Sequence, residues 1–163
     1  MKKINLLIST FFGYGYLTKI PGTVTSLVTT VFIYIAYEYL GYTDLRFSII
    51  FFTLLFFYSF YAVKDAESEF KNKDPRQIVI DEVLGQAMPL ILLLYLSQTN
   101  QLNIQIEIYY VLSFVFFRFF DILKPFPVNY FDKNFKNYFG IIMDDIMAGL
   151  YSIILIYLIS LKL

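Results

Sequence analysis

The sequence predicts an all-α integral membrane protein, a polytopic bundle of about five spanning helices with a possible N-terminal interfacial or re-entrant helix. Two observations support this fold class. Of the 163 residues, 58% are hydrophobic and only 16% are charged, whereas a soluble domain carries about 25% charged residues. The chain also contains several long apolar stretches, and a helix needs about 20 apolar residues to cross a bilayer. Because no linker or internal repeat divides it, we expect a single domain over residues 1–163.

Five apolar stretches are the candidate spans, and they differ in length. The first, second and fifth approach the length that crosses a bilayer. The third and fourth are shorter, and we expect residues 78–82 and 121–123 to extend them. Residues 4–17 are too short for a full span and are not followed by a cleavage pattern, which favours a retained interfacial or re-entrant helix. In chain order, the five stretches are 22–40, 47–63, 83–97, 108–120 and 141–161.

Lysine and arginine are distributed unevenly between the segments that connect these stretches. Of the 13 such residues, all but Arg46 and Lys162 lie in segments 1–21, 64–77 and 118–140. Positive residues are enriched in cytoplasmic loops, so the N-terminus is predicted to be cytoplasmic and the C-terminus external. Four lysines outside the motifs described below are expected to be surface charges near anionic lipid head groups: Lys71, Lys73, Lys133 and Lys136.

The composition excludes several kinds of chemistry. The chain has no cysteine and no histidine, which excludes disulfides, thiolate metal sites, cysteine nucleophiles and imidazole bases. Thirteen basic and 13 acidic residues give no net charge, so nucleic-acid binding is not expected. Any catalysis would therefore depend on carboxylates, hydroxyls, lysine, arginine or a hard metal ion.

Two pairs of adjacent acidic residues stand at the starts of apolar stretches. They are Asp81 and Glu82 in "IVIDEVLG", and Asp144 and Asp145 in "GIIMDDIMAG". The helix dipole stabilises an acid in the first turn by about 0.3–1 kcal/mol, which explains one acid of each pair. Adjacent helical residues point about 100° apart, so capping does not explain the second. Acidic residues in membrane segments are functional by default, and we interpret both pairs in this way.

A third motif, "FRFFDILKPFP", places Arg118, Asp121 and Lys124 three residues apart on one helix face, before Pro125 and Pro127 end the helix. One interpretation is a ladder of salt bridges at the interface. The other is an aspartate that binds a metal between two cations that bind phosphate. Because clustered carboxylates need a counter-charge, the sequence predicts either Mg²⁺, which prefers oxygen ligands, or internal pairing with Arg118 or Lys124.

A fourth motif, "KIPGTVTS", precedes the first long apolar stretch. Free backbone N–H groups at the start of this helix, together with Gly22 and the hydroxyls of Thr23 and Ser26, would form an anion-binding site. The alternative is an ordinary helix start with Thr23 as the N-cap. In the predicted topology all four motifs face the cytoplasm, so we expect them to converge on one site.

These four motifs, in this order, resemble the phosphatidylglycerophosphatase A family from Gly13 to about Gly149. The patterns Pro-Gly-Thr, Ile-Val-x-Asp-Glu-x-x-Gly, Phe-Arg-x-Phe-Asp-x-x-Lys-Pro-x-Pro and Gly-Ile-x-x-Asp-Asp-x-x-Ala-Gly are all present. The resemblance implies a Mg²⁺-dependent phosphatase of the bacterial inner membrane. Such an enzyme converts phosphatidylglycerophosphate to phosphatidylglycerol at the cytoplasmic face, in the biosynthesis of phosphatidylglycerol and cardiolipin.

The resemblance and the acid pairs together give a set of candidate site residues. Five carboxylates are the predicted metal ligands and catalytic groups, with one of them also acting as general base. Two cations and three residues at the first helix start are predicted to bind the substrate phosphate. The carboxylates are Asp81, Glu82, Asp121, Asp144 and Asp145, and the phosphate-binding residues are Arg118, Lys124, Gly22, Thr23 and Ser26.

Two other functions compete with this prediction. An ion or proton transporter would also use acids within membrane segments, but its acids should be spread across the bilayer rather than gathered at one face. A CDP-alcohol phosphotransferase would carry an Asp-x-x-Asp-Gly-x-x-Ala-Arg motif, which the chain does not have. The sequence makes no prediction of an oligomeric state.

Overall fold

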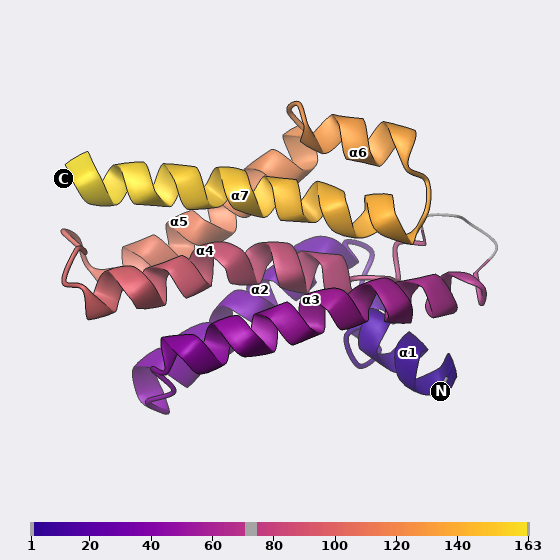
Figure 1. Cartoon of the computed structure of the whole chain (residues 1–163), viewed down its shortest axis with the longest axis horizontal. Helices are drawn as coiled ribbons and strands as arrows, with labels where there is room; N and C mark the ends of the chain where they lie inside the picture. The colour runs from indigo at the N-terminus through magenta and orange to yellow at the C-terminus, as the bar shows by residue number, and fades with distance from the viewer. Residues whose placement is uncertain (1, 71–74, 163) are drawn as a thin grey trace.

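A computed structural model describes residues 2–70 and 75–162, with Lys162 described by its backbone alone. Over this part of the chain every regular element is helical, which confirms the all-α prediction (Figure 1). A 3₁₀ turn, η1 (Tyr14–Tyr16), follows α1, and a π-helical turn, η2 (Ile35–Tyr39), follows α2. The α-helices are α1 (Lys2–Ser9), α2 (Pro21–Tyr34), α3 (Leu45–Glu67), α4 (Ile80–Gln98), α5 (Ile106–Leu123), α6 (Val128–Asn134) and α7 (Tyr138–Lys162).

The five predicted apolar stretches coincide with α2 plus η2, α3, α4, α5 and α7. The expected extension of α5 over 121–123 is present, whereas that of α4 over 78–82 is present only from Ile80, where the helix begins. Among the described residues, three helices are long and apolar enough to cross a membrane: α3, α4 and α7. The α-helical part of α2 has only 14 residues. Helix α5 contains Glu107, Arg118 and Asp121 within its 18 residues. The structure therefore supports three spans by length and composition and does not confirm five.

Helices α4 and α7 run side by side in the same direction (Figure 1) and approach closely at two glycines. A methyl group added at Gly149 would lie 2.6 Å from the carbonyl oxygen of Gly85. One added at Gly85 would lie 2.6 Å from the carbonyl oxygen of Asp145. Within α4, Pro89 is four residues after Gly85 and has no backbone N–H to donate to the Gly85 carbonyl. The absence of side chains at these two positions brings the acid-bearing parts of α4 and α7 together. Asp81 and Glu82 lie in the first turn of α4, as expected, but α7 begins at Tyr138 and has no acid in its first turn, so helix capping explains neither Asp144 nor Asp145.

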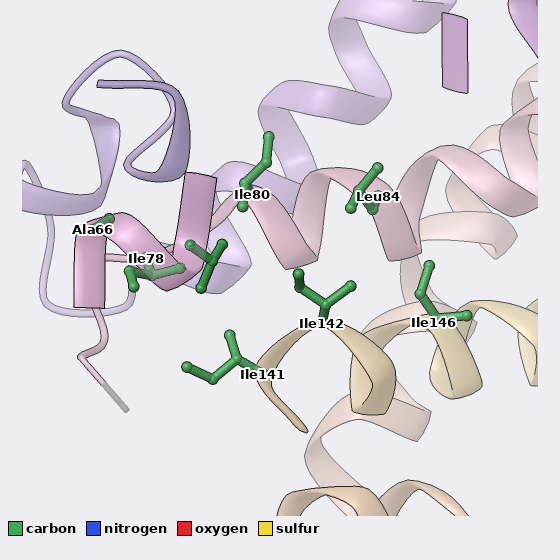
Figure 2. Close-up of a cluster of buried hydrophobic side chains, with 8 residues drawn as sticks. Ala66, Ile78, Ile80, Leu84, Ile141, Ile142 and Ile146 are labelled. Atoms are coloured by element: carbon green, nitrogen blue, oxygen red, sulfur yellow. The ribbon is translucent and has the colours of Figure 1, made fainter. Parts of the chain in front are cut away.

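An apolar cluster fills the space beside these parts of α4 and α7. It includes Ile80 and Leu84 of α4 and Ile142 and Ile146 of α7, all buried. Figure 2 shows Ile142 and Ile146 pointing from α7 toward α4. Because isoleucine side chains have few rotamers, this packing fixes the rotation of each helix about its axis. That rotation determines which faces of the two helices the acidic residues occupy.

The N-terminal segment packs against α3 and against the segment that leads into α4. The side-chain amide of Asn5 donates to Asp65 Oδ2 at 2.7 Å, and the Tyr58 hydroxyl donates to Asn5 Oδ1 at 2.7 Å. Further on, the Val79 N–H donates to the carbonyl of Ser9 at 2.9 Å, and Gly15 lies against the carbonyl of Gln77. In place of the single helix expected over residues 4–17, the chain forms the short helix α1 and the 3₁₀ turn η1, and their contacts support the segment that leads into α4.

Candidate active site

A cavity of about 170 Å³ opens where α4 and α7 begin and α5 ends. Its wall is formed by residues from α4, α6 and α7, the end of α5, and the segments that precede α4 and α7. Nine charged residues line it, which is unusual in a chain with so few charges. They are Arg76, Asp81, Glu82, Asp121, Lys124, Asp132, Lys136, Asp144 and Asp145. All five carboxylates predicted from the sequence therefore meet in one cavity.

Three of these carboxylates form a compact group. Asp81, Glu82 and Asp145 each contribute an oxygen, and the three oxygens lie within 4.8 Å of one another. Asp81 is 8% exposed and Asp145 is 3% exposed. Within the described part of the chain, no group donates a hydrogen bond to Asp81 Oδ1, Glu82 Oε2 or Asp145 Oδ2. Buried carboxylate oxygens without donors are strongly unfavourable unless a cation neutralises them. This donor set and geometry fit a hard divalent ion such as Mg²⁺.

Asp144 differs from Asp145 in its partners, although the two are adjacent in the chain. Asp144 Oδ2 lies 2.8 Å from the Lys124 ammonium, and Asp144 Oδ1 accepts the backbone N–H of Asp145 at 3.1 Å. The angle of about 100° between successive helical residues directs the two side chains to different parts of the cavity. Asp145 joins the group of three carboxylates, and Asp144 holds a cation beside it.

Arg118 and Asp121 form the ion pair that their spacing predicts, with Arg118 Nη1 2.7 Å from Asp121 Oδ2. Lys124 does not continue this pair as a ladder. Helix α5 ends at Leu123, and Lys124 has φ 48°, so its side chain turns away from Asp121. It contacts Asp144 on α7 and Asp132 on α6 instead.

The start of α2 also reaches the site, through Gly22. A methyl group added at Gly22 would collide with the Glu82 carboxylate and lie 3.4 Å from Arg118 Nη1. Thr23 is not the N-cap, because Ile20 occupies that position without a side-chain hydrogen bond. Ser26 is turned into its own helix, where its hydroxyl donates to the Gly22 carbonyl at 2.9 Å. Of the five predicted phosphate-binding residues only Lys124 lines the cavity, and Gly22, Thr23, Ser26 and Arg118 do not.

Asp132 belongs to the site but was not predicted from the sequence. It lies on α6, and its Oδ1 is 2.9 Å from the Lys124 ammonium and 3.5 Å from the Lys136 ammonium. Lys136, predicted to be a lipid-facing surface charge, lines the cavity. Their i,i+4 spacing just after the proline pair predicts an ion pair, but exposed surface residues show the same spacing, so it did not indicate a site. Lys71 and Lys73, which were also predicted to be surface charges, lie outside the described residues.

The ion pairs around Lys124 keep it charged. Burial disfavours its charged form, but attraction to Asp144 and Asp132 outweighs burial and raises the pKa of the Lys124 ammonium above its ordinary value. Partial burial also opposes ionisation of Asp132. The neighbouring Lys124 and Lys136 outweigh it, so the pKa of Asp132 lies below its ordinary value. Both groups are therefore ionised at neutral pH, and a positive charge is maintained beside the three carboxylates.

A group of buried carboxylates flanked by an arginine and a lysine, at one end of a bundle of apolar helices, is characteristic of a membrane enzyme that acts on phosphate esters. The sequence profile of the family described as phosphatidylglycerophosphatase A matches residues 7–160. The chain belongs to this family, as the four motifs predicted, and it is a phosphatase.

The chain is also similar in sequence to three named bacterial proteins. A protein of Haemophilus influenzae named phosphatidylglycerophosphatase A is 34% identical, over 98% of this chain and 94% of its own length. A protein of Bacteroides thetaiotaomicron named putative phosphatidylinositol-3-phosphatase is 35% identical, over 93% of this chain and 90% of its own length. A protein of Escherichia coli K12 named phosphatidylglycerophosphatase A is 29% identical, over 94% of this chain and 82% of its own length. No solved structure shows a significant match.

Proposed function

We propose that the protein is a Mg²⁺-dependent lipid phosphatase that hydrolyses phosphatidylglycerophosphate to phosphatidylglycerol and phosphate. We place this reaction at the cytoplasmic face of the bacterial inner membrane, in the biosynthesis of phosphatidylglycerol and cardiolipin. The observation that carries the proposal is the group formed by the buried Asp81 and Asp145 and the half-buried Glu82, each of which contributes an oxygen within 4.8 Å of the others. Family membership supports lipid phosphatase activity.

Asp81, Glu82 and Asp145 are the residues proposed to hold Mg²⁺, because their oxygens are buried and have no donors among the described residues. Asp121 and Asp144 line the same cavity and are the further candidate ligands. When bound, the ion would neutralise the phosphate dianion and increase the acidity of a water molecule.

Side chains in the cavity, and Arg118 paired with the lining residue Asp121, would supply the remaining chemistry. One carboxylate accepts the proton of the attacking water, as general base. Arg118 and Lys124 stabilise the negative charge on the phosphoryl oxygens. Both cations are already held by carboxylates, at 2.7 Å from Asp121 and 2.8 Å from Asp144, so they need little reorganisation during the reaction. Gly22 leaves room for the Glu82 carboxylate beside Arg118.

The proposed membrane placement has five spans, with α2 plus η2 and α5 as the shorter two. Helix α3 supports contact with lipid, because Phe47, Ile50, Phe51, Leu54 and Phe57 are all more than half exposed. A soluble protein rarely exposes so much contiguous apolar surface. The cavity lies at the end of the bundle near which most of the lysines and arginines occur, which supports a cytoplasmic active site by the positive-inside rule.

The position of the acids favours a phosphatase over the transporter alternative. Five carboxylates line one cavity at the starts of α4 and α7, at the end of α5 and beside α6. A pathway for ions would need polar groups along the whole depth of the bundle. The clustered arrangement instead suits a substrate whose phosphate lies at the membrane surface.

The direct test of this proposal is phosphate release from phosphatidylglycerophosphate in detergent micelles. We expect turnover with Mg²⁺ and loss of turnover with EDTA, with recovery when excess Mg²⁺ is added. Phosphatidylinositol 3-phosphate should be assayed in parallel, because one relative is named for that substrate. Absence of phosphate release from phosphatidylglycerophosphate under both conditions would refute the proposed substrate.

A further inference from the structure

The rim of the cavity carries two cations that the proposed reaction does not use. Arg76 lies in the segment before α4, and Lys136 lies between α6 and α7. Both line the same cavity as the three carboxylates, and both residues are exposed. Sixty positions separate them in the chain, so the fold brings them to one opening.

These rim cations are less neutralised than the inner ones. Arg118 and Lys124 lie 2.7–2.9 Å from carboxylate oxygens. Lys136 is 3.5 Å from Asp132, whose same oxygen lies closer to Lys124. No carboxylate of the described residues lies within ion-pair distance of Arg76. An arginine at a rim can bind a phosphate through two parallel N–H···O bonds, and a lysine contributes a point charge.

The proposed substrate has two phosphate groups of different kinds. The phosphomonoester is the group that is hydrolysed, and a glycerol joins it to a phosphodiester that remains in the product. If the monoester enters the cavity toward Asp81, Glu82 and Asp145, the diester must lie farther out, toward the opening. A singly charged anion at the opening would meet Arg76 and Lys136.

We propose that Arg76 and Lys136 form a second phosphate subsite, which binds the phosphodiester of the lipid head group. This inference rests on the proposed function, because it deepens the recognition of that substrate. The enzyme then holds the head group at both phosphates and distinguishes a lipid that carries both groups from a simple phosphomonoester. Asp132 has a positioning role, since it lies between Lys124 and Lys136 and links the inner and rim cations.

Exposed apolar residues next to the cavity agree with a lipid diester at this place. Ile122, Leu123 and Phe126 flank Lys124 in the chain and are 71%, 62% and 72% exposed. Lys124 itself lines the cavity. Apolar side chains beside the opening provide a surface for acyl chains, while the rim cations contact the charged diester at the level of the head groups.

The test uses two soluble ligands, two rim substitutions made singly and together, a conservative replacement of Arg76, and two control substitutions. Glycerophosphoglycerol carries only the diester, and inorganic phosphate is a probe for the inner site. Their dissociation constants are measured by ³¹P NMR titration of the detergent-solubilised protein in Mg²⁺, so the measurement does not depend on activity. Arg76→Ala and Lys136→Ala are compared with Arg46→Ala and Lys133→Ala, because these two control residues are exposed and do not line the cavity.

We expect each rim substitution to weaken glycerophosphoglycerol binding about tenfold, as for the loss of one charge-assisted hydrogen bond. Binding of inorganic phosphate should change less than about twofold, which also shows that the inner site is intact. Arg76→Lys should recover part of the loss, and both controls should match the wild type. The KM for phosphatidylglycerophosphate should rise in parallel with the loss of diester binding, with kcat little changed.

Unchanged glycerophosphoglycerol binding in the Arg76→Ala, Lys136→Ala double variant would overturn the subsite. Equal weakening of both ligands in the rim variants would also overturn it, since this would indicate a general structural effect. Failure of the wild-type protein to hydrolyse phosphatidylglycerophosphate would refute the proposed function instead. The NMR titration would still decide whether the rim binds a diester, so the two failures are distinguishable.

Discussion

Replacement of Asp145 by asparagine is expected to abolish phosphatase turnover while the protein remains folded. Asparagine has nearly the same shape but removes one of the three charges whose oxygens lie within 4.8 Å of one another. A bound divalent ion supplies several kcal/mol of charge stabilisation, so kcat should fall by about a thousandfold. The measurement is phosphate release at saturating Mg²⁺, with circular dichroism to verify the helical content. Asp81→Asn is expected to have the same effect.

Asp44→Asn is the matched control for these variants. Asp44 is exposed and is the N-cap of α3, where its side chain accepts the N–H of Phe47 at 3.1 Å. Asparagine is an equally good N-cap, so activity and stability should be unchanged. If Asp145→Asn and Asp81→Asn both retained more than about a tenth of the wild-type kcat, the three-carboxylate group could not be the catalytic centre.

Substitution of Gly85 by alanine is expected to separate α4 from α7 and to disrupt the site without changing any charged residue. The added methyl would lie 2.6 Å from the Asp145 carbonyl oxygen and would also collide with the Phe117 ring. A backbone atom cannot move away as a flexible side chain can, so the two helices must shift. Such overpacking costs about 1–3 kcal/mol, and we expect at least a hundredfold loss of activity, because small misplacements of reacting groups cost about that much.

The sign of the change in stability of Gly85→Ala distinguishes the effect of the clash from that of helix propensity. Helix propensity alone would make Gly85→Ala stabilising by about 1 kcal/mol, whereas the clash predicts destabilisation. Thermal unfolding in detergent distinguishes these outcomes. Gly149→Ala tests the same contact from the opposite helix, because its methyl would lie 2.6 Å from the Gly85 carbonyl oxygen. Wild-type or higher stability of both variants would show that the close approach of α4 and α7 is not required.

The helices could be predicted from the sequence because their signals are local. Apolar stretches indicate all three of α4, α5 and α7, the acids in its first turn mark the start of α4, and the proline pair after Lys124 marks the end of α5. The convergence of Asp81, Glu82 and Asp145 was also predictable, since the distribution of positive residues assigned their motifs to one membrane face.

The pairing within the site could not be predicted in the same way. The φ of 48° at Lys124 turns its side chain from Asp121 toward Asp144 and Asp132. The partners Asp132 and Asp144 lie on α6 and α7, and no spacing in the sequence indicates that these two helices meet Lys124. Asp132 and Lys136 were indistinguishable from ordinary surface charges until the fold placed them at the cavity. The separate roles of Asp144 and Asp145 likewise depend on the rotation of α7, which its buried isoleucines fix.

Binding of Mn²⁺, as a paramagnetic substitute for Mg²⁺, tests the central claim most directly. Electron paramagnetic resonance of the detergent-solubilised protein reports free and bound Mn²⁺ without any need for turnover. We expect saturable binding that Mg²⁺ displaces in the wild type and in Asp44→Asn. The same binding should be weakened at least about tenfold in Asp81→Asn, Glu82→Gln and Asp145→Asn, because each loses a charged ligand. Wild-type affinity for Mn²⁺ in all three of these variants would contradict a metal site at Asp81, Glu82 and Asp145.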